Sequence, residues 1–315
     1  MTDTEEPTDE QESETNVSDE IELDFSIGEQ HIAAFKDATL DDSLAALVSK
    51  HLEKLVQEAG LSDLEVVLLF DDKSISSWHS NRIYHAVKDL ATSKRNILMI
   101  ISSNGGEIEP AYLISKTCRR LAKKKFVISV PRKAKSAATL ISLGAAEVHM
   151  GLLSELGPID PQFNGFPALG LSNAMEKIAE ISERCPSASD MLAKYLTENV
   201  SIAHLGLFER VNESAVQYAA RLLQGKNLPH GQTPENLADH FTNHYKDHGF
   251  VIDADEAATL LGKSVVKENT KEYELGNSIY EFLEFNKLLY SLFKNKTARY
   301  VGGIRSCVHL VDEKP

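Results

Sequence analysis

The fold of this chain is indicated most strongly by residues 97–106, which read Ile-Leu-Met-Ile-Ile-Ser-Ser-Asn-Gly-Gly. An apolar run before two glycines predicts a buried strand that enters a tight turn. Adjacent glycines allow positive φ and leave room for a substrate carbonyl to approach main-chain N–H groups, as an oxyanion hole requires. Gly105 and Gly106 are therefore candidates for contact with a substrate.

Thirty residues after Gly106, a serine also follows a strand-like run. Ser136 stands in Lys-Ser-Ala-Ala-Thr at 135–139, after a strand-like run at 126–130, and opens a small-residue helix at 137–144. A side chain there lies at the positive end of the helix dipole, and the N–H of Ala137 is free to donate to an oxyanion. Taken singly, these features are typical of a tight turn and of a helix N-cap, but their order favours an acyl-transfer site.

Around these residues the hydrophobic pattern alternates between strands and helices. Strands are predicted at 64–71, 96–102, 126–130 and 147–150, and helices at 31–58, 78–93, 108–123 and 137–144. Such alternation predicts an α/β fold with a mainly parallel sheet and a ligand site at the carboxyl ends of its strands. From about 171 the chain is predicted to be mostly helical, ending in a helix at 276–296 whose aromatic residues indicate core or a subunit interface.

Composition divides the chain into three parts. Residues 1–24 hold eleven acidic and no basic side chains, which accounts for most of the net charge of −14. We therefore expect an acidic disordered tail at 1–25, a catalytic core at 26–170 and a helical region at 171–315 that completes the fold. The tail is predicted either to keep the protein in solution or to dock on a basic surface.

Several classes of protein are not favoured by the sequence. No apolar run reaches the roughly 20 residues of a membrane helix, and the acidic N-terminus does not resemble a signal peptide, so we expect a cytoplasmic protein. Three widely spaced cysteines, at 118, 185 and 307, fit neither a disulfide framework nor a zinc site. No Gly-x-Gly-x-x-Gly follows a strand, so we expect no nicotinamide, and no other cofactor or metal is predicted.

Four motifs together resemble the serine dehydrogenase proteinase family of the ClpP/crotonase superfamily, which is related to the signal peptide peptidase SppA. They are Ser-Asn-Gly-Gly-Glu at 103–107, Lys-Ser-Ala-Ala-Thr at 135–139, Leu-Gly-Ala-Ala-Glu at 143–147 and Met-Gly-Leu-Leu-Ser-Glu-Leu-Gly-Pro-Ile-Asp-Pro-Gln at 150–162. The resemblance covers residues 60–165, with a weaker echo at 247–258. It implies a ClpP/crotonase-like core, a homo-oligomer and a serine endopeptidase with nucleophile Ser136 and oxyanion donors Gly106 and Ala137.

The general base is not decided by the sequence. ClpP-type enzymes carry a histidine where this chain has Asp160-Pro161-Gln162, so a triad of that kind is not visible. SppA-like peptidases pair serine with a lysine forty to fifty residues downstream, which points to Lys177 or Lys194; a desolvated lysine can serve because burial lowers its pKa. His248, in Asp-His-Gly-Phe at 247–250, is the rival base, and His149 is a further candidate.

Two functional hypotheses follow. The first is a cytoplasmic serine peptidase of SppA/ClpP type that acts on a peptide or protein through an acyl-enzyme on Ser136. The second is a catalytically silent ClpP-like module that binds peptides or assembles with partners; crotonase chemistry is a weaker third, because it would not need Ser136. A run of basic residues between 119 and 135 suggests a rim that attracts acidic peptides, whereas sparse aromatics there and the acidic chain do not favour nucleic acid.

Overall fold

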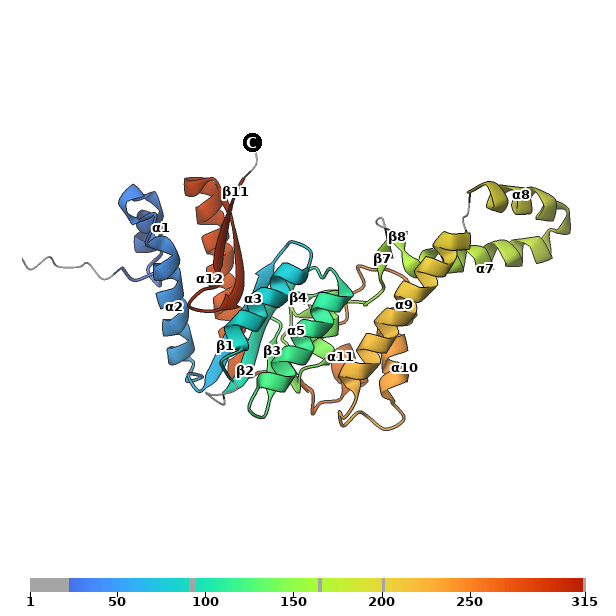
Figure 1. Cartoon of the computed structure of the whole chain (residues 1–315). Coiled ribbons are helices and arrows are strands. Elements are labelled where there is room, and N and C mark those ends of the chain that lie inside the picture. Colours follow the sequence, from blue (N-terminus) through green and yellow to red (C-terminus); the bar gives the residue numbers. More distant parts are fainter. Residues whose placement is uncertain (1–22, 91–94, 164–165, 200–201, 314–315) are drawn as a thin grey trace, which may run out of the picture.

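A twisted, mostly parallel sheet runs through the centre of the protein (Figure 1). The computed structural model describes residues 23–90, 95–163, 166–199 and 202–313. The main sheet has the strand order β11-β10-β1-β2-β3-β5-β9. Its strands are β1 (Leu64–Asp71), β2 (Asn96–Ser103), β3 (Phe126–Ser129), β5 (Glu147–His149), β9 (Val266–Lys267), β10 (Lys296–Gly303) and β11 (Val308–Asp312).

Strands β1, β2, β3, β5 and β9 are parallel to one another, whereas β10 is antiparallel to both of its neighbours, β1 and β11. The central strands are buried along almost their whole length because helices cover both faces of the sheet. Side chains alternate between the two faces, so that Val67 and Leu69 enter one apolar cluster while Leu68 and Phe70 enter the other. The fold is thus α/β, as the alternating pattern predicted.

The helices form two layers. One face of the sheet is covered by α3 (Ser77–Val87), α5 (Ile108–Leu121), α6 (Ala137–Leu143), α9 (Ile202–Leu223), α10 (Pro234–Asp239) and α11 (Ala254–Leu261). The other is covered by α1 (Gly28–Lys36), α2 (Leu44–Glu58) and α12 (Lys271–Lys294). On α12 the rings of Phe282 and Tyr290 are buried in the second cluster, whereas Phe293 is exposed.

Two parts of the structure differ from the predicted elements. The single helix expected at 31–58 is broken, because the Asp37 carboxylate accepts a hydrogen bond from the N–H of Thr39 at 2.8 Å and starts a short 3-10 turn, Ala38–Leu40, between α1 and α2. The C-terminal part is not only helical. Strands β10 and β11 extend the sheet beside β1, and β9 extends its opposite edge.

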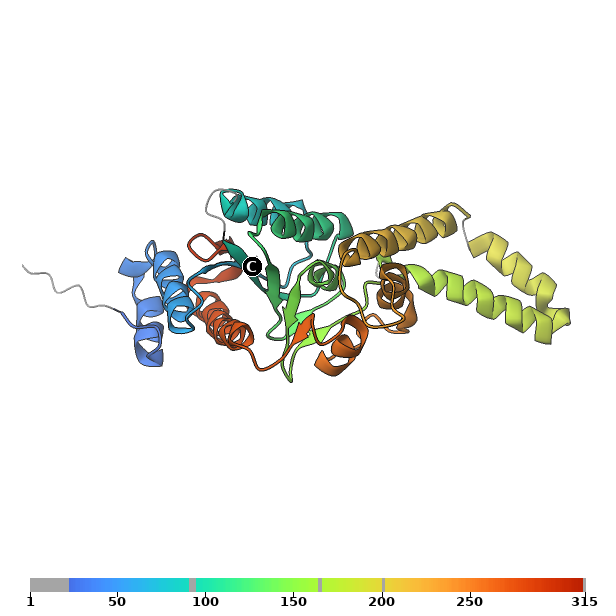
Figure 2. The same cartoon turned by 90° about the horizontal axis from the view of Figure 1, so that it is seen from below.

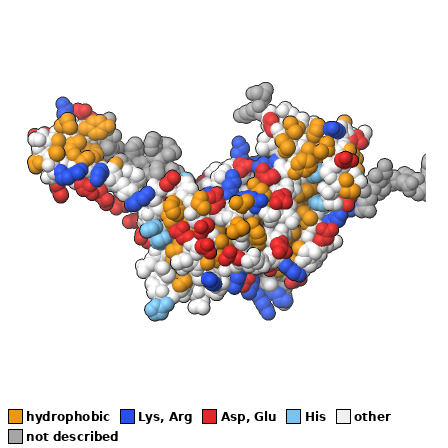
Figure 3. Space-filling model, turned by 180° about the vertical axis from the view of Figure 1, so that it is seen from behind, with side chains coloured by type: hydrophobic (Ala, Val, Ile, Leu, Met, Phe, Trp, Pro, Cys, Tyr) orange, Lys and Arg blue, Asp and Glu red, His pale blue; other side chains and the backbone are white. Residues whose placement is uncertain are grey.

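A helical arm projects from the body beyond the sheet (Figures 1 and 2). It consists of α7 (Ala168–Arg184), α8 (Ser189–Asn199) and the first part of α9. Hydrophobic side chains gather on this arm (Figure 3), where Met191 and Tyr195 are exposed. Within the described ranges, none of the helices is both long and apolar enough to cross a membrane.

The predicted acidic tail falls largely outside the described residues, since residues 1–22 are not among them. The chain packs on the core from residue 23 onward. Phe25 is buried and its ring stacks on His31 at a centroid distance of 4.3 Å, while the Asp24 carboxylate accepts a hydrogen bond from Lys54 at 3.1 Å.

Candidate active site

The two glycines after β2 form a turn that only glycine fits. Gly105 has φ +99° and Gly106 has φ +154°. A Cβ on Gly106 would lie 2.2 Å from the N atom of Ile75, and one on Gly105 would lie 2.7 Å from the Cβ of Ser136. Both the backbone angles and the close contacts therefore require glycine at these positions.

The loop after β1 holds this turn in place. The N–H of Ile75 donates to the Gly105 carbonyl at 2.8 Å, and the Ile75 carbonyl accepts from the N–H of Glu107 at 2.9 Å. Residue 75 therefore pairs with Gly106 as in a short parallel bridge. These bonds use the groups on either side of Gly106 and fix the direction of its own N–H.

Ser136 lies on a strained connection between strand and helix. Its backbone has φ +50° and ψ −118°, a region that residues other than glycine adopt rarely and at a cost of about 1–3 kcal/mol. The short strand β4 (Lys133–Ala134) pairs with the end of β2, and the N–H of Lys135 donates to the Ser103 carbonyl at 3.0 Å. The nucleophile candidate is therefore held directly beside the glycine turn, at the N-terminus of α6.

Two backbone donors are available next to Ser136. Among the hydrogen bonds of the described residues, none uses the N–H of Gly106 or the N–H of Ala137. By contrast, the N–H of Gly105 donates to the Ser103 hydroxyl at 3.2 Å. The arrangement leaves the two amides that the sequence predicted as oxyanion donors unengaged at the mouth of the nucleophile helix.

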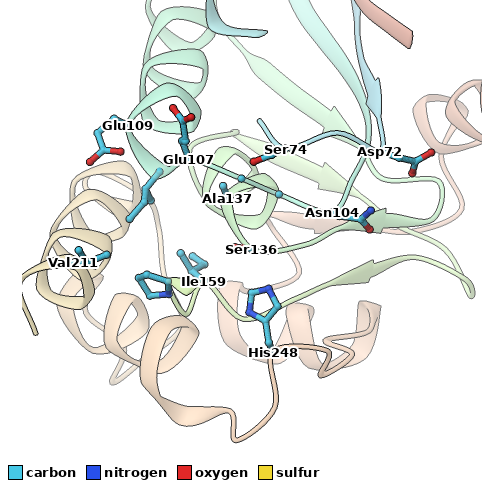
Figure 4. Close-up of a pocket in the computed structure, with 14 residues that line it drawn as sticks. Asp72, Ser74, Asn104, Glu107, Glu109, Ser136, Ala137, Ile159, Val211 and His248 are labelled. Atoms are coloured by element: carbon cyan, nitrogen blue, oxygen red, sulfur yellow. The ribbon is translucent and has the colours of Figure 1, made fainter. Parts of the chain in front are cut away.

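A pocket of about 650 Å³ opens over these residues (Figure 4). Gly105, Gly106, Ser136, Ala137 and His248 all line it. Its remaining wall combines the apolar side chains of Ile108, Ile159, Pro161 and Val211 with Ser74, Asn104 and the carboxylates of Asp72, Glu107 and Glu109. A volume of this size, with an apolar wall and a few convergent polar groups, is typical of a binding site for a small molecule or a peptide segment.

His248 points toward Ser136 in this pocket (Figure 4). Its imidazole is bonded to a buried carboxylate. Its Nδ1 is in hydrogen-bond contact with Oδ1 of Asp160, whose side chain is 8% exposed, whereas the His248 side chain is 36% exposed. The bond to the Asp160 carboxylate raises the pKa of His248, although burial acts in the opposite direction. In the tautomer in which Nδ1 donates to Asp160, Nε2 is the nitrogen that can accept a proton.

The segments that carry Asp160 and His248 are joined to each other and to the nucleophile helix. Leu156 and Ile252 exchange backbone hydrogen bonds at 2.9 and 3.1 Å in an isolated antiparallel bridge. On the other side, the N–H of Gly157 donates to the buried hydroxyl of Thr139 on α6 at 3.0 Å. Ser136, Asp160 and His248 therefore belong to one hydrogen-bonded unit, although they are far apart in the sequence.

The other predicted bases lie elsewhere. Lys177 is exposed on α7 and pairs with Glu180 at 2.6 Å, and Lys194 is exposed on α8 of the arm. His149 is buried on β5, where its Nδ1 lies 2.8 Å from the Thr270 hydroxyl and burial lowers its pKa. None of these three residues lines the pocket of Ser136.

The basic run predicted as a rim is also dispersed. Its members engage different parts of the fold: Arg119 donates to the Leu222 carbonyl, Lys125 pairs with Glu147, Arg132 donates to Asn277, Lys133 pairs with Asp72 and Lys135 pairs with Glu155. The described pocket lining holds three carboxylates and no lysine or arginine. These basic side chains therefore do not enter the pocket lining, although Lys133 pairs with Asp72 at its wall.

The fold and site define a class of protein. A model of the ClpP-like SDH-type serine proteinase family matches residues 70–230, about half of the chain. The chain therefore belongs to this family, as the four motifs predicted.

Individual relatives are more distant. The chain is 34% identical over 105 residues to uncharacterized protein MJ0137 of Methanocaldococcus jannaschii, and the match covers 33% of this chain and 36% of that protein. The matched segment thus spans about a third of the relative's length.

Two solved structures are also similar, both of the 1510-N membrane-bound stomatin-specific protease. A serine-to-alanine mutant is 16% identical with a TM-score of 0.42, covering 81% of this chain and all of that one. A lysine-to-alanine mutant in complex with a substrate peptide is 15% identical with a TM-score of 0.41, covering 80% of this chain and 89% of that one.

Asp160 is the residue that the sequence analysis did not assign to the site. In the sequence, position 160 indicates only that the histidine of ClpP-type enzymes is absent there, and nothing local links Asp160 to His248. The signal was present in two motifs, Gly-Pro-Ile-Asp-Pro-Gln at 157–162 and Asp-His-Gly-Phe at 247–250, which the fold brings together.

Proposed function

We propose that this chain is a serine peptidase in which Ser136 is the nucleophile, His248 the general base and Asp160 the group that orients the histidine. The observation that carries the proposal is the pairing of His248 with a buried Asp160 in the pocket of the strained Ser136 turn. Each group has the role that a Ser-His-Asp triad requires, in the chain order Ser, Asp, His.

The reaction would proceed in two steps. The Ser136 oxygen attacks the carbonyl carbon of a peptide bond while Nε2 of His248 takes its proton, and the N–H groups of Gly106 and Ala137 stabilise the oxyanion. His248 then protonates the leaving amine, which leaves an acyl-enzyme on Ser136. A water molecule activated by His248 releases the acid and restores the serine.

Lys177 is the competing base, and a set of matched variants separates it from His248. Purified protein is treated with a fluorophosphonate probe, and the labelled residue is identified by mass spectrometry. We expect labelling at Ser136 in the wild type and in Lys177→Ala, and a large loss in Ser136→Ala and His248→Gln. Loss in Lys177→Ala with retention in His248→Gln would overturn the assignment of the base.

No labelling of the folded wild-type protein would favour the second hypothesis, a silent module that binds peptides. Binding without cleavage would then be the observation to seek, using a fluorescent peptide library and fluorescence polarisation. The volume and mixed wall of the pocket are compatible with either outcome.

We further propose that the protein forms a homo-oligomer through its helical arm. Exposed apolar side chains such as Met191 and Tyr195 support self-association, because exposed hydrophobic patches commonly mark interfaces. Sedimentation of the wild type and of Met191→Lys tests this, and a wild-type monomer at micromolar concentration would contradict it. The cytoplasmic location and the three-part domain division stay predictions from the sequence.

A further inference from the structure

Lys135, the residue before Ser136, extends toward the two segments that carry Asp160 and His248. Its side chain is 14% exposed. The ammonium lies 2.8 Å from the Glu155 carboxylate and donates to the Phe250 carbonyl at 3.1 Å, with the Gly249 carbonyl at 3.5 Å. The two carbonyls belong to the residues that directly follow His248.

The Lys135 stem is also packed closely. A Cβ on Gly157 would lie 2.5 Å from the Cδ of Lys135. The glycine therefore makes room for the lysine stem at the start of the segment that ends in Asp160. One side chain thus contacts both the Asp160 segment and the His248 loop, while its own backbone leads into Ser136.

Besides the bond between His248 and Asp160, the His248 loop is bonded within itself, because the N–H of Phe250 donates to the Asp247 carbonyl at 3.1 Å and the N–H of Gly249 donates to the Asp247 carboxylate at 3.0 Å. Val251 is 51% exposed and Phe250 is 42% exposed, although the Phe250 ring lies against Tyr245 at a centroid distance of 4.7 Å. The backbone bridge to Leu156 is made only at Ile252, four residues after the histidine. A cation that bonds the carbonyls at 249 and 250 therefore holds the loop close to the catalytic side chain.

We propose that Lys135 is a positioning residue that holds the His248 loop and the Asp160 segment against the nucleophile turn. This inference rests on the proposed serine peptidase function. Lys135 does not line the pocket and its ammonium is engaged with Glu155, so it acts through His248 and not on the substrate.

The Lys135 charge also acts on the histidine. Three charged groups influence His248: Asp160 and Asp247 raise its pKa, and Lys135 lowers it. Removing the lysine charge should therefore raise the pKa of His248, provided that the loop stays in place. This effect moves the acid limb of the pH–rate profile to higher pH, which a purely structural role would not do.

The test compares Lys135→Met with Lys294→Met. Lys294 is a matched control because its side chain is 12% exposed and paired with Asp41, far from the pocket on α12. We expect Lys135→Met to lose about 10- to 100-fold in kcat and in the rate of fluorophosphonate labelling, because small misplacements of reacting groups have effects of this size. The KM should change little, and Lys135→Arg should recover part of the rate. Lys294→Met should keep the wild-type rate.

NMR titration of the His248 imidazole separates this inference from the proposed function, since it needs no turnover. A shifted titration in Lys135→Met, together with a wild type that is not labelled at Ser136, would refute the peptidase and keep the action of Lys135 on His248. A labelled wild type with unchanged rate, pH profile and His248 titration in folded Lys135→Met would overturn the inference alone. Thermal melts of all variants identify any that fail to fold.

Discussion

Replacing Gly106 by alanine is the most direct test of the proposed oxyanion hole. The new Cβ would lie 2.2 Å from the N atom and 2.5 Å from the O atom of Ile75, and 2.6 Å from the Ser74 hydroxyl oxygen. Two of these three atoms are backbone atoms in a bridge, so a side-chain rotation cannot relieve the clash. The Gly106 peptide must move away from Ile75.

The movement has two consequences of different size. Backbone strain at a positive φ and loss of the bonds to Ile75 should destabilise the fold by about 1–3 kcal/mol. Misdirecting the Gly106 N–H removes one of two oxyanion donors, which should lower kcat by about 10²–10³-fold. The loss of activity should therefore persist under conditions in which the variant is fully folded.

Gly60→Ala is the matched control. Gly60 also has a positive φ, +68°, but no atom lies within 4 Å of the position of its Cβ, and it does not line the pocket. We expect this variant to lose stability without loss of the fluorophosphonate labelling rate. If folded Gly106→Ala were labelled at a rate within about threefold of Gly60→Ala, the assignment of the Gly106 donor would be wrong.

Three further expectations concern neighbouring groups. The pKa of His248 is raised in the folded state, so its bond to Asp160 stabilises the fold fully below pH 6.5 and less as the pH rises through the folded pKa, whereas activity should rise over the same interval. Thermal melts and reaction rates measured against pH check the two directions, and Asp160→Asn should shift the rate profile to lower pH. Ser136→Gly should melt at a higher temperature than Ser136→Ala, because glycine relieves a strain of about 1–3 kcal/mol that alanine keeps; equal melting temperatures would argue against strain. Glu109→Gln should reduce kcat/KM for lysine-containing peptides more than for acidic peptides, and this difference should shrink in high salt. An equal reduction for the two classes of peptide would exclude an electrostatic preference.

Local patterns were sufficient to predict the central strands and the glycine turn at Gly105 and Gly106. Residues 66–70 and 97–101 are continuously apolar and are followed by polar and turn residues, so the type and approximate bounds of these strands follow from the sequence. The strand at 296–303 was missed because it mixes charged residues with two glycines and directly follows a long helix. Its place in the sheet depends on pairing with β1, which is a long-range contact that local pattern does not contain.

The general base also could not be identified from local sequence patterns, because its position depends on long-range contacts. Lys177 lies at the sequence spacing expected of an SppA-like lysine, but spacing along a chain fixes a position in space only when the intervening segment packs back on the site. Here that segment continues into α7, which leaves the body and exposes Lys177 to solvent. His248 is 112 residues from Ser136, yet the bridge between Leu156 and Ile252 returns its loop to the Asp160 segment.

This geometry gives a reason why an aspartate in the Gly-Pro-Ile-Asp-Pro-Gln motif is compatible with catalysis. An acid at 160 cannot act as the base toward Ser136 while its carboxylate is buried and bonded to an imidazole. It can, however, fix the tautomer of His248 and stabilise the imidazolium that forms when Ser136 gives up its proton. In the proposed triad, a later loop supplies the histidine that a ClpP-type triad would place after the helix that follows Ser136. The position of that ClpP-type histidine carries the Asp160 carboxylate instead. An Asp160→His exchange should therefore abolish labelling of Ser136 and not convert the site to the ClpP arrangement, because it removes the buried carboxylate that is bonded to His248.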